Sequence, residues 1–150
     1  MKRRDQPKID RLKQAAPFTA CTQKQLDFIA RRMTECHAPA GAELAGEGVT
    51  GREFFVIIEG SATVFVGHRA VATLRAGDCF GEVALLDWGT RTATVVANSD
   101  LLLAVSGALE FSEILAEVPS VARKMLTGLS SRLRAAHESL SRSLESPAFA

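Results

Sequence analysis

Glycine is distributed unevenly along the 150-residue chain, and this constrains the fold more than any other feature. Ten of the eleven glycines lie between Gly41 and Gly107, whereas the first forty residues contain none and the last forty contain only Gly128. Glycine supplies the positive φ angles of tight turns and weakens helices, so a glycine-rich stretch favours short strands joined by turns. We therefore expect a β-rich middle between two helical flanks.

The middle of the chain predicts a series of short antiparallel strands. EFFVII (Glu53–Ile58) and ATVFV (Ala62–Val66) are rich in β-branched and aromatic residues, and Glu59-Gly60 between them predicts a hairpin. Further strands are expected over Ala70–Leu74, Thr92–Ala97 and Leu101–Val105. The last two are expected to pair with each other around an Asn-Ser-Asp turn. Many short strands separated by glycine turns are typical of a small barrel or jelly roll.

Both flanks predict helices. Thr22-Gln23-Lys24-Gln25 has the form of a capping box, in which the side chains of Thr22 and Gln25 each satisfy a free backbone N–H of the first turn. Near the C-terminus we expect a short helix before Pro119 and a longer helix from Ser120 to about Glu145. The apolar residues of the longer helix alternate in threes and fours, forming a seam that packs on the β-unit or on a partner helix. These residues are Ala122, Leu126, Leu129, Leu133, Ala136 and Leu140.

The composition is that of a soluble globular protein with one core, since 47 % of the residues are apolar and 23 % are charged. A net charge of +1 argues against a strong electrostatic footprint for nucleic acid or for a membrane surface. The sequence contains no signal peptide and no apolar run long enough to cross a bilayer. Its three cysteines follow no metal-binding spacing, which predicts free thiols in a reducing cytoplasm.

The familiar catalytic motifs do not occur in the sequence. No phosphate loop, H-E-x-x-H or G-x-S-x-G pattern is present, and the three histidines are scattered. GEGVTG (Gly46–Gly51) satisfies G-x-G-x-x-G, but a predicted strand follows it where a dinucleotide site needs a helix, so we interpret it as a turn-forming loop. Neither an enzyme nor a metal site is expected.

One segment contains residues suited to binding a ligand, namely FGEVALLDWGTRTATVVA (Phe80–Ala97). Within it, Arg91 is the only basic residue between Arg75 and Arg123. GEVALL can form one helical turn, whose first N–H groups favour an anion, and Gly81 allows close approach to the backbone. Arg91 offers a planar fork suited to phosphate. A carboxylate such as Glu82 is unfavourable beside an anion site unless it has a role of its own. Accepting a hydrogen bond from a ligand hydroxyl would be such a role. Together these groups indicate a site for a sugar phosphate.

The alternative is an internal salt bridge between Arg91 and Glu82, or an arginine at the domain surface. On spacing alone this alternative is slightly favoured, because ion pairs within one loop are common and contribute little to stability.

The same segment resembles the phosphate-binding cassette of cyclic nucleotide-binding domains, whose pattern is roughly F-G-E-L-A-L-L followed by P-R-x-A-T. The resemblance extends to PAGAELAGEGVTGREFFVIIEGSATV and to both flanks, from about Phe18 to Leu133. It implies an α+β, mainly β fold: an eight-stranded jelly-roll β-barrel with N-terminal helices and a long C-terminal helix. The implied organisation is an N-terminal helical segment (1–35), a barrel (36–106) with its cassette at 80–94, C-terminal hinge and lid helices (107–145) and a tail (146–150).

The resemblance also implies roles for individual residues. Glu82 would bind the ribose 2′-hydroxyl, and Arg91 would pair with the cyclic phosphate. The cassette residues expected to contact the ligand are Phe80, Gly81, Glu82, Val83, Ala84, Arg91, Thr92 and Ala93, with backbone N–H groups at Val83 and Ala84 and the cradle lined by Thr92 and Ala93. Further candidates for the wall around the base, or for the lid on the long helix, are Val56, Val71, Leu74, Thr127, Ser130 and Ser131.

Two positions depart from the family pattern or bear on the ligand. Thr90 stands where the family usually has proline, which leaves the turn before Arg91 looser in the unbound state. Thr92 follows the arginine, and in the family a threonine here can favour cGMP through the guanine amino group, although it also occurs in cAMP binders. The expected ligand is therefore cAMP, with cGMP left open, and no cofactor is expected.

The implied function is a cytoplasmic cyclic-nucleotide sensor in which binding repositions the C-terminal helix. Only about five residues follow Glu145, so a helix-turn-helix has no room and no nucleic-acid or membrane partner is expected. A homodimer or an effector protein, contacted through the C-terminal helix, remains open as a partner. Two rival hypotheses stay beside the sensor: a ligand-independent interaction or dimerisation module on the same fold, and a sensor for another small anion.

Overall fold

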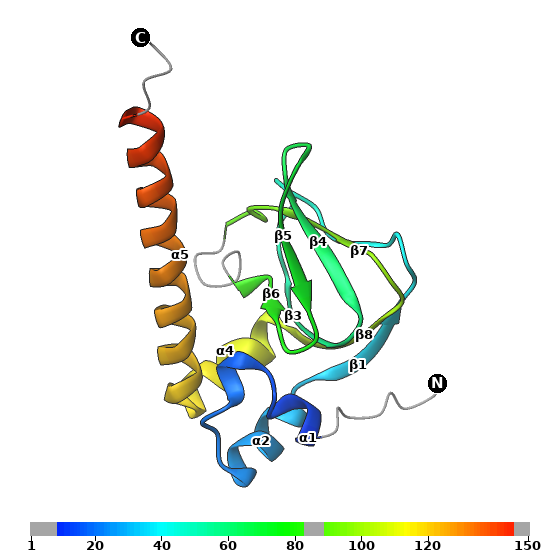
Figure 1. Ribbon diagram of the computed structural model, residues 1–150. Helices are drawn as coiled ribbons and strands as arrows, with labels where there is room; N and C mark the ends of the chain where they lie inside the picture. Colours follow the sequence, from blue (N-terminus) through cyan, green and yellow to red (C-terminus); the bar gives the residue numbers. More distant parts are fainter. Residues whose placement is uncertain (1–8, 83–88, 146–150) are drawn as a thin grey trace.

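The computed structural model describes residues 9–82 and 89–145. The described residues form eight strands in two antiparallel sheets, with helices at both ends of the chain (Figure 1). This confirms the jelly-roll fold and the helical flanks. The elements are α1 (Ile9–Leu12), η1 (Ala16–Phe18), α2 (Gln23–Ala30), β1 (Thr34–Ala38), β2 (Glu43–Ala45), β3 (Glu53–Glu59), β4 (Ser61–Val66), β5 (Arg69–Arg75), β6 (Cys79–Phe80), β7 (Thr94–Ala97), β8 (Leu101–Gly107), α4 (Ala108–Glu117) and α5 (Pro119–Glu145).

The pairing of the strands differs from the sequence prediction in two places. One sheet has the order β1-β8-β3-β6 and the other β2-β7-β4-β5, so β3 and β4 are not a hairpin, and β7 and β8 do not pair. The turn at Gly60 and the turn at Asn98–Asp100 both carry the chain from one sheet to the other. Gly60 has φ +98°, and a Cβ there would lie 2.5 Å from the carbonyl oxygen of Asp100. The two crossover turns therefore pack directly on each other.

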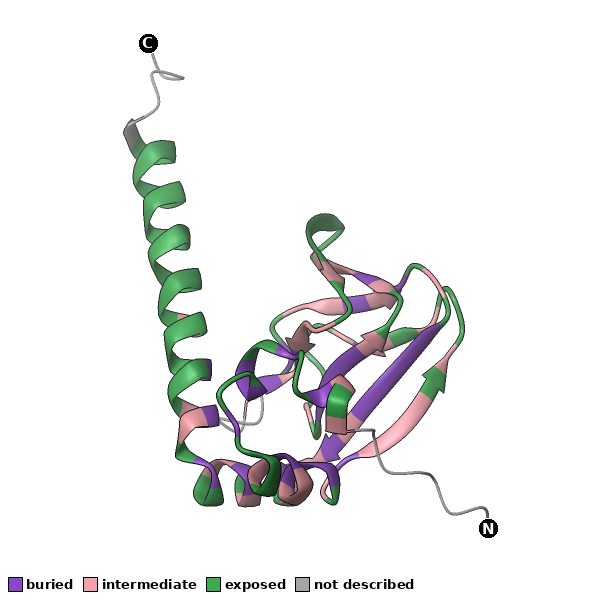
Figure 2. Cartoon of the chain, turned by 60° about the horizontal axis from the view of Figure 1, so that its bottom comes forward, coloured by how far each residue is buried: buried purple, intermediate pink, exposed green. Residues whose placement is uncertain are grey.

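Strand β3 explains why one sheet is covered by helices. Phe55 and Ile57 belong to the core between the two sheets, whereas Phe54 and Val56 belong to a second core. That second core is built with side chains from α1, α2, α4 and the start of α5 (Figure 2). A strand buried on both faces has a continuous apolar sequence, which accounts for the pattern FFVII.

The predicted capping box begins α2. The hydroxyl of Thr22 accepts from the backbone N–H of Gln25 at 3.2 Å, and the side-chain carbonyl of Gln25 accepts from the N–H of Thr22 at 2.9 Å. Two free donors of the first turn are thus satisfied within the helix itself.

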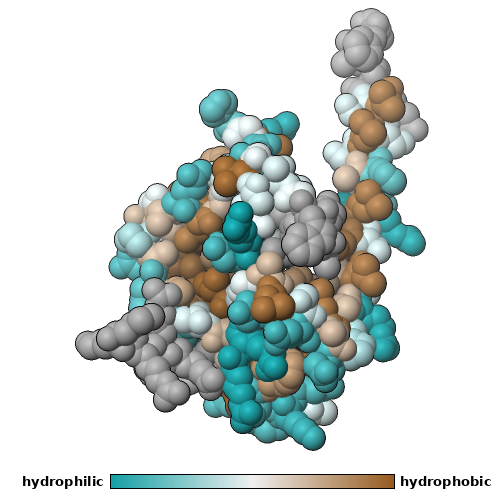
Figure 3. Space-filling view, turned by 180° about the vertical axis from the view of Figure 1, so that it is seen from behind, coloured by the Kyte–Doolittle hydropathy of each residue, from teal (hydrophilic) through white to brown (hydrophobic). Residues whose placement is uncertain are grey.

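Helix α5 packs into the core at its start. Val121 and Met125 are buried, and Lys124 donates to the hydroxyl of Thr19 at 2.6 Å. Beyond Leu129 the helix projects past the barrel, and its described side chains are exposed (Figures 1 and 2). Hydrophobic side chains recur along this projecting part (Figure 3). The outer half of the apolar seam is therefore not covered by the described residues of the chain.

None of the helices in the described part of the chain combines the length and the apolar character needed to cross a membrane.

Candidate functional site

Arg91 is buried next to the start of β3 and the end of β6. Its side chain lies beside the Phe55 ring, and the residue is only 7 % exposed. The guanidinium donates to the carbonyl oxygen of Gly81 at 3.0 Å and to that of Glu53 at 2.8 Å. These acceptors are neutral, and they hold the planar group in one orientation.

The charge of Arg91 has no close counter-ion in the described structure. Among residues 9–82 and 89–145 it forms no ion pair, so the Arg91–Glu82 salt bridge considered above is not formed. Burial lowers the pKa of the Arg91 guanidinium, while the charges of Glu53 and Glu82 oppose that shift. A guanidinium stays charged in proteins, and a buried charge is costly without a partner of opposite sign. The site is therefore suited to an anion.

The backbone of Arg91 is fixed by the loop that carries the GEGVTG sequence. The N–H of Arg91 donates to the carbonyl of Val49 at 2.7 Å, and its carbonyl accepts from the N–H of Gly48 at 2.9 Å. Thr90 and Thr50 form an isolated antiparallel bridge beside these bonds. The loop, interpreted from the sequence only as a turn, thus holds the arginine in place.

Gly81 has a structural reason to be glycine. Its φ is +94°, and a Cβ there would lie 2.6 Å from Nη1 of Arg91 and 2.6 Å from the carbonyl oxygen of Glu53. The sequence argument assigned this glycine to close approach of a ligand. The structure adds that a side chain at this position would displace the arginine.

Glu82 forms an ion pair with a residue that the sequence analysis missed. Glu82 is 7 % exposed, and its carboxylate accepts from Nη2 of Arg132 on α5. Helical spacing could have pointed to Arg132. It lies seven residues after the buried Met125, and therefore on the face of the helix that Met125 turns toward the barrel. The cassette pattern contains no such partner, which is why Arg132 escaped notice.

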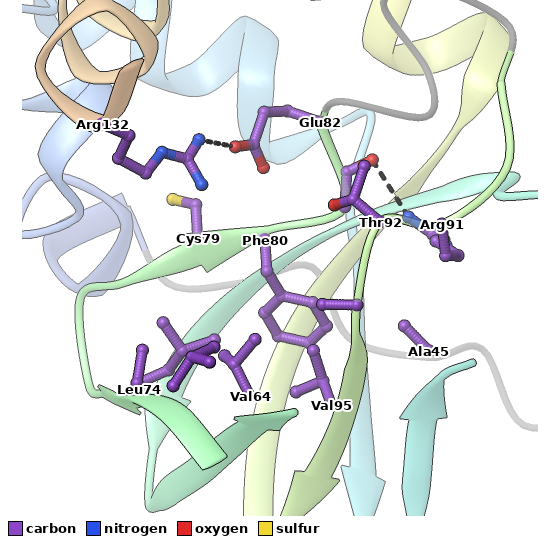
Figure 4. Close-up of a pocket in the computed structure, with 14 residues that line it drawn as sticks. Ala45, Val64, Leu74, Cys79, Phe80, Glu82, Arg91, Thr92, Val95 and Arg132 are labelled. Carbon is purple, nitrogen blue, oxygen red and sulfur yellow. Dashed lines mark hydrogen bonds and ion pairs between the residues drawn. The ribbon is translucent and has the colours of Figure 1, made fainter. Parts of the chain in front are cut away.

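Arg91, Glu82 and Arg132 line one cavity of about 290 Å³ (Figure 4). Arg91 lies on one side of it, the Glu82–Arg132 pair on another, and apolar side chains form the rest of the wall. Eight predicted residues line it: Phe80, Gly81, Glu82, Arg91, Thr92, Ala93, Val71 and Leu74. The lining also includes Ala45, Val64, Ala72, Cys79, Val95 and Arg132, which were not predicted. Charged groups with an apolar wall fit a ligand that is polar at one end and apolar at the other.

The remaining predicted residues lie elsewhere. Val56 is fully buried in the core and does not line the cavity. Thr127 lines a neighbouring cavity of about 770 Å³ and donates to the carbonyl of Arg123 at 3.1 Å. Ser130 and Ser131 are exposed on α5 and line neither cavity. The predictions for Val83 and Ala84 fall outside the described residues.

Cys79 lies in the wall shared by the two cavities. Burial raises the pKa of its thiol, and the negative charges of Glu82 and Asp78 add to this. The side chain is therefore a neutral thiol at physiological pH. Among the described residues no three His, Cys, Asp or Glu side chains are grouped so as to hold a metal ion.

The model of the cyclic nucleotide-binding domain family matches residues 35–118. The chain belongs to this family. The family resemblance of the cassette is thereby confirmed, and the family fold is a non-catalytic, regulatory one.

Among curated proteins, the chain is 36 % identical over 91 residues to a cAMP-dependent protein kinase regulatory subunit of Hypocrea atroviridis, covering 61 % of this chain and 20 % of that protein. Among solved structures it resembles the catabolite activator protein of Thermus thermophilus, with a TM-score of 0.80, 26 % identity and coverage of 85 % of this chain and 62 % of that one. The regulatory domain of Toxoplasma gondii PKA, crystallised with cAMP, gives a TM-score of 0.64 and 29 % identity, covering 71 % of this chain and 42 % of that one. The chain thus spans about a fifth of the length of the curated regulatory subunit.

Proposed function

We propose that this protein is a cyclic-nucleotide sensor whose ligand is cAMP, with cGMP as the alternative. The observation that carries the proposal is the buried guanidinium of Arg91, which is held by two neutral carbonyls and faces a cavity. A cyclic phosphate supplies the missing negative charge, and the ribose hydroxyl donates to Glu82. The apolar wall accommodates the base. This choice of ligand is supported by two relatives: a regulatory subunit of a cAMP-dependent protein kinase and a PKA regulatory domain that was crystallised with cAMP.

The proposed output is a change in the position of α5. A ligand shifts the helix only if the two positions differ in affinity for it. The arrangement of α5 supports this coupling, because its base packs on the barrel while the rest of the helix projects from it.

The test is calorimetric titration of nucleotide-stripped protein with cAMP and with cGMP. We expect micromolar or tighter binding, and Arg91→Ala should weaken it by about 100-fold or more, because two charge-assisted hydrogen bonds to phosphate are lost. The ratio of the cAMP and cGMP affinities measures the contribution of Thr92.

Controls separate the site from general effects of charge and folding. Arg75→Ala removes an exposed arginine of β5 that does not line the cavity, and it should leave the affinity unchanged. Arg91→Lys keeps the charge, so it reports on the site even if Arg91→Ala unfolds. Absence of heat and of thermal stabilisation with both nucleotides, in well-folded wild-type protein, would refute the sensor.

A second function, a ligand-independent dimerisation module, is favoured by the seam of α5. Leu126, Leu133 and Leu140 recur every seven residues and are exposed, with Leu133 58 % exposed. Ala122, Leu129 and Ala136 lie four residues before each of them. This is the apolar repeat of a two-helix coiled coil, and a second copy of the chain is the partner that presents the same repeat.

A further inference from the structure

The GEGVTG loop contacts two different parts of the barrel. On one side the N–H of Gly48 donates to the carbonyl of Arg91 at 2.9 Å, and the N–H of Glu47 donates to the hydroxyl of Thr94 at 3.0 Å. On the other side the carboxylate of Glu47 accepts from the backbone N–H of Gly67 at 2.8 Å. Gly67 belongs to the turn that joins β4 to β5. Glu47 therefore links the segment that carries Arg91 to the tip of the β4–β5 hairpin.

This hairpin supplies an apolar wall of the cavity that Arg91 lines. Its four lining residues are Val64, Val71, Ala72 and Leu74. In Figure 4, Val64 and Leu74 lie on one side of Phe80, and Arg91 lies on the other. The wall and the arginine thus face different parts of a ligand in the cavity. In the proposed nucleotide complex, the arginine meets the phosphate and the wall meets the base.

The tip of the hairpin lies outside the main body of its sheet. The pairing of β4 with β7 ends at Phe65 and Thr94, and β5 is the last strand of the sheet, so the tip projects from the barrel (Figure 1). Val66 on β4 and Val71 on β5 are 47 % and 51 % exposed, so packing restrains this end of the hairpin only weakly. A contact at the tip therefore has a strong influence on where the wall of β5 lies.

We propose that Glu47 is a positioning residue, which sets the distance between the apolar wall and Arg91 by holding the tip of the hairpin. This inference rests on the sensor function proposed above and deepens it by naming a residue that shapes the base side of the site. Glu47 acts through the hairpin, since it lies outside the described lining of the cavity. The contacts of the loop with Arg91 and Thr94 use backbone groups of the loop, so they persist when the carboxylate is removed.

The reach of the side chain at position 47, and not its charge, should decide the affinity. Glu47→Ala removes the acceptor and should weaken cAMP binding roughly 3-fold to 10-fold, which is the contribution of one hydrogen bond. Glu47→Asp keeps the charge but is one methylene shorter, so it should weaken binding in the same way. Glu47→Gln keeps the length and an acceptor oxygen and should stay close to wild type. As a control, Glu117→Ala removes an exposed carboxylate of α4 and should leave the affinity unchanged.

A ligand without a base separates positioning of the wall from a general loss of structure. Ribose 3,5-cyclic phosphate keeps the sugar and the ring phosphate of cAMP but has nothing to place against the apolar wall. Its affinity is measured by calorimetric competition with cAMP. Glu47→Ala should weaken binding of cAMP and leave binding of the base-free compound unchanged. Arg91→Ala should weaken binding of both, because both carry the phosphate.

Amide hydrogen exchange at Gly67 checks the contact itself. The N–H of Gly67 should exchange faster in Glu47→Ala and Glu47→Asp than in the wild type and Glu47→Gln, and circular dichroism melting shows whether each variant is folded. Unchanged cAMP affinity in Glu47→Ala and Glu47→Asp, or an equal loss for cAMP and the base-free compound, would overturn the role of Glu47 while the sensor stands. A wild-type protein that binds no nucleotide refutes the sensor, and the role of Glu47 falls with it.

Discussion

At the scale of single residues, the site depends on the hydrogen bonds that hold Arg91 in place. Its guanidinium is held by carbonyls from Gly81 and Glu53, and its backbone by Gly48 and Val49. Glu53, Gly48 and Val49 lie far from Arg91 in the sequence, so tertiary contacts place the arginine. A group fixed before the ligand arrives costs little side-chain entropy on binding, which favours affinity.

Gly81 gives a prediction at this scale. Gly81→Ala introduces a Cβ at φ +94° that would meet the guanidinium of Arg91 and the backbone of Glu53. We expect the free energy of unfolding to fall by about 1–3 kcal/mol, and binding of cAMP to weaken because Arg91 is displaced. Urea denaturation and calorimetry measure the two effects.

Gly41→Ala is the matched control for this variant. Gly41 has φ +86°, but a Cβ there meets nothing within 4 Å, so only the backbone strain remains. This variant should lose less stability and keep its affinity for cAMP. Equal losses of stability in the two variants, together with unchanged binding in Gly81→Ala, would contradict the role given to Gly81.

At the scale of elements, local patterns were predictable and the pairing of strands was not. The capping box at Thr22 was predictable because it depends on residues three positions apart. The strands on either side of Gly60 were also predictable, but Glu59-Gly60 suits a hairpin as well as a crossover. In the structure the crossover at Gly60 lies against Asp100, forty residues away, and the residues of the turn itself do not encode that neighbour. Arg132 was missed for the same reason, since its partner Glu82 belongs to a distant part of the chain.

Helix α5 gives the prediction at this scale. Gly128 lies within the helix, is exposed, and a Cβ there meets nothing within 4 Å. Gly128→Ala should therefore stabilise the protein by up to about 1 kcal/mol through the helix propensity of alanine. Urea denaturation followed by circular dichroism measures the gain. Ala135→Gly, at another exposed position of α5, should produce a loss of similar size. A destabilised Gly128→Ala protein would mean that a partner helix or another group approaches this glycine closely.

At the scale of the whole molecule, the site and the seam meet on one helix. Arg132, which contacts Glu82, is the neighbour of Leu133 in the exposed seam. A change at the cassette that moves Arg132 therefore moves the surface that a second copy would contact. In the sensor, association of α5 depends on nucleotide, whereas in a ligand-independent module it does not. Linkage requires that any effect of nucleotide on association be matched by an effect of association on nucleotide affinity.

Sedimentation measurements with and without cAMP distinguish these two functions. We expect the wild-type chain to self-associate, and Leu133→Glu to abolish this by placing a charge in the apolar seam, while cAMP binding is retained. Ser131→Glu adds the same charge at an exposed position off the seam and should still associate. A dimerisation constant that changes when cAMP is added supports the sensor. A constant that is the same with and without cAMP supports the ligand-independent dimerisation module. A wild-type protein that stays monomeric at high concentration, with and without cAMP, would show that the seam does not join two copies of the chain.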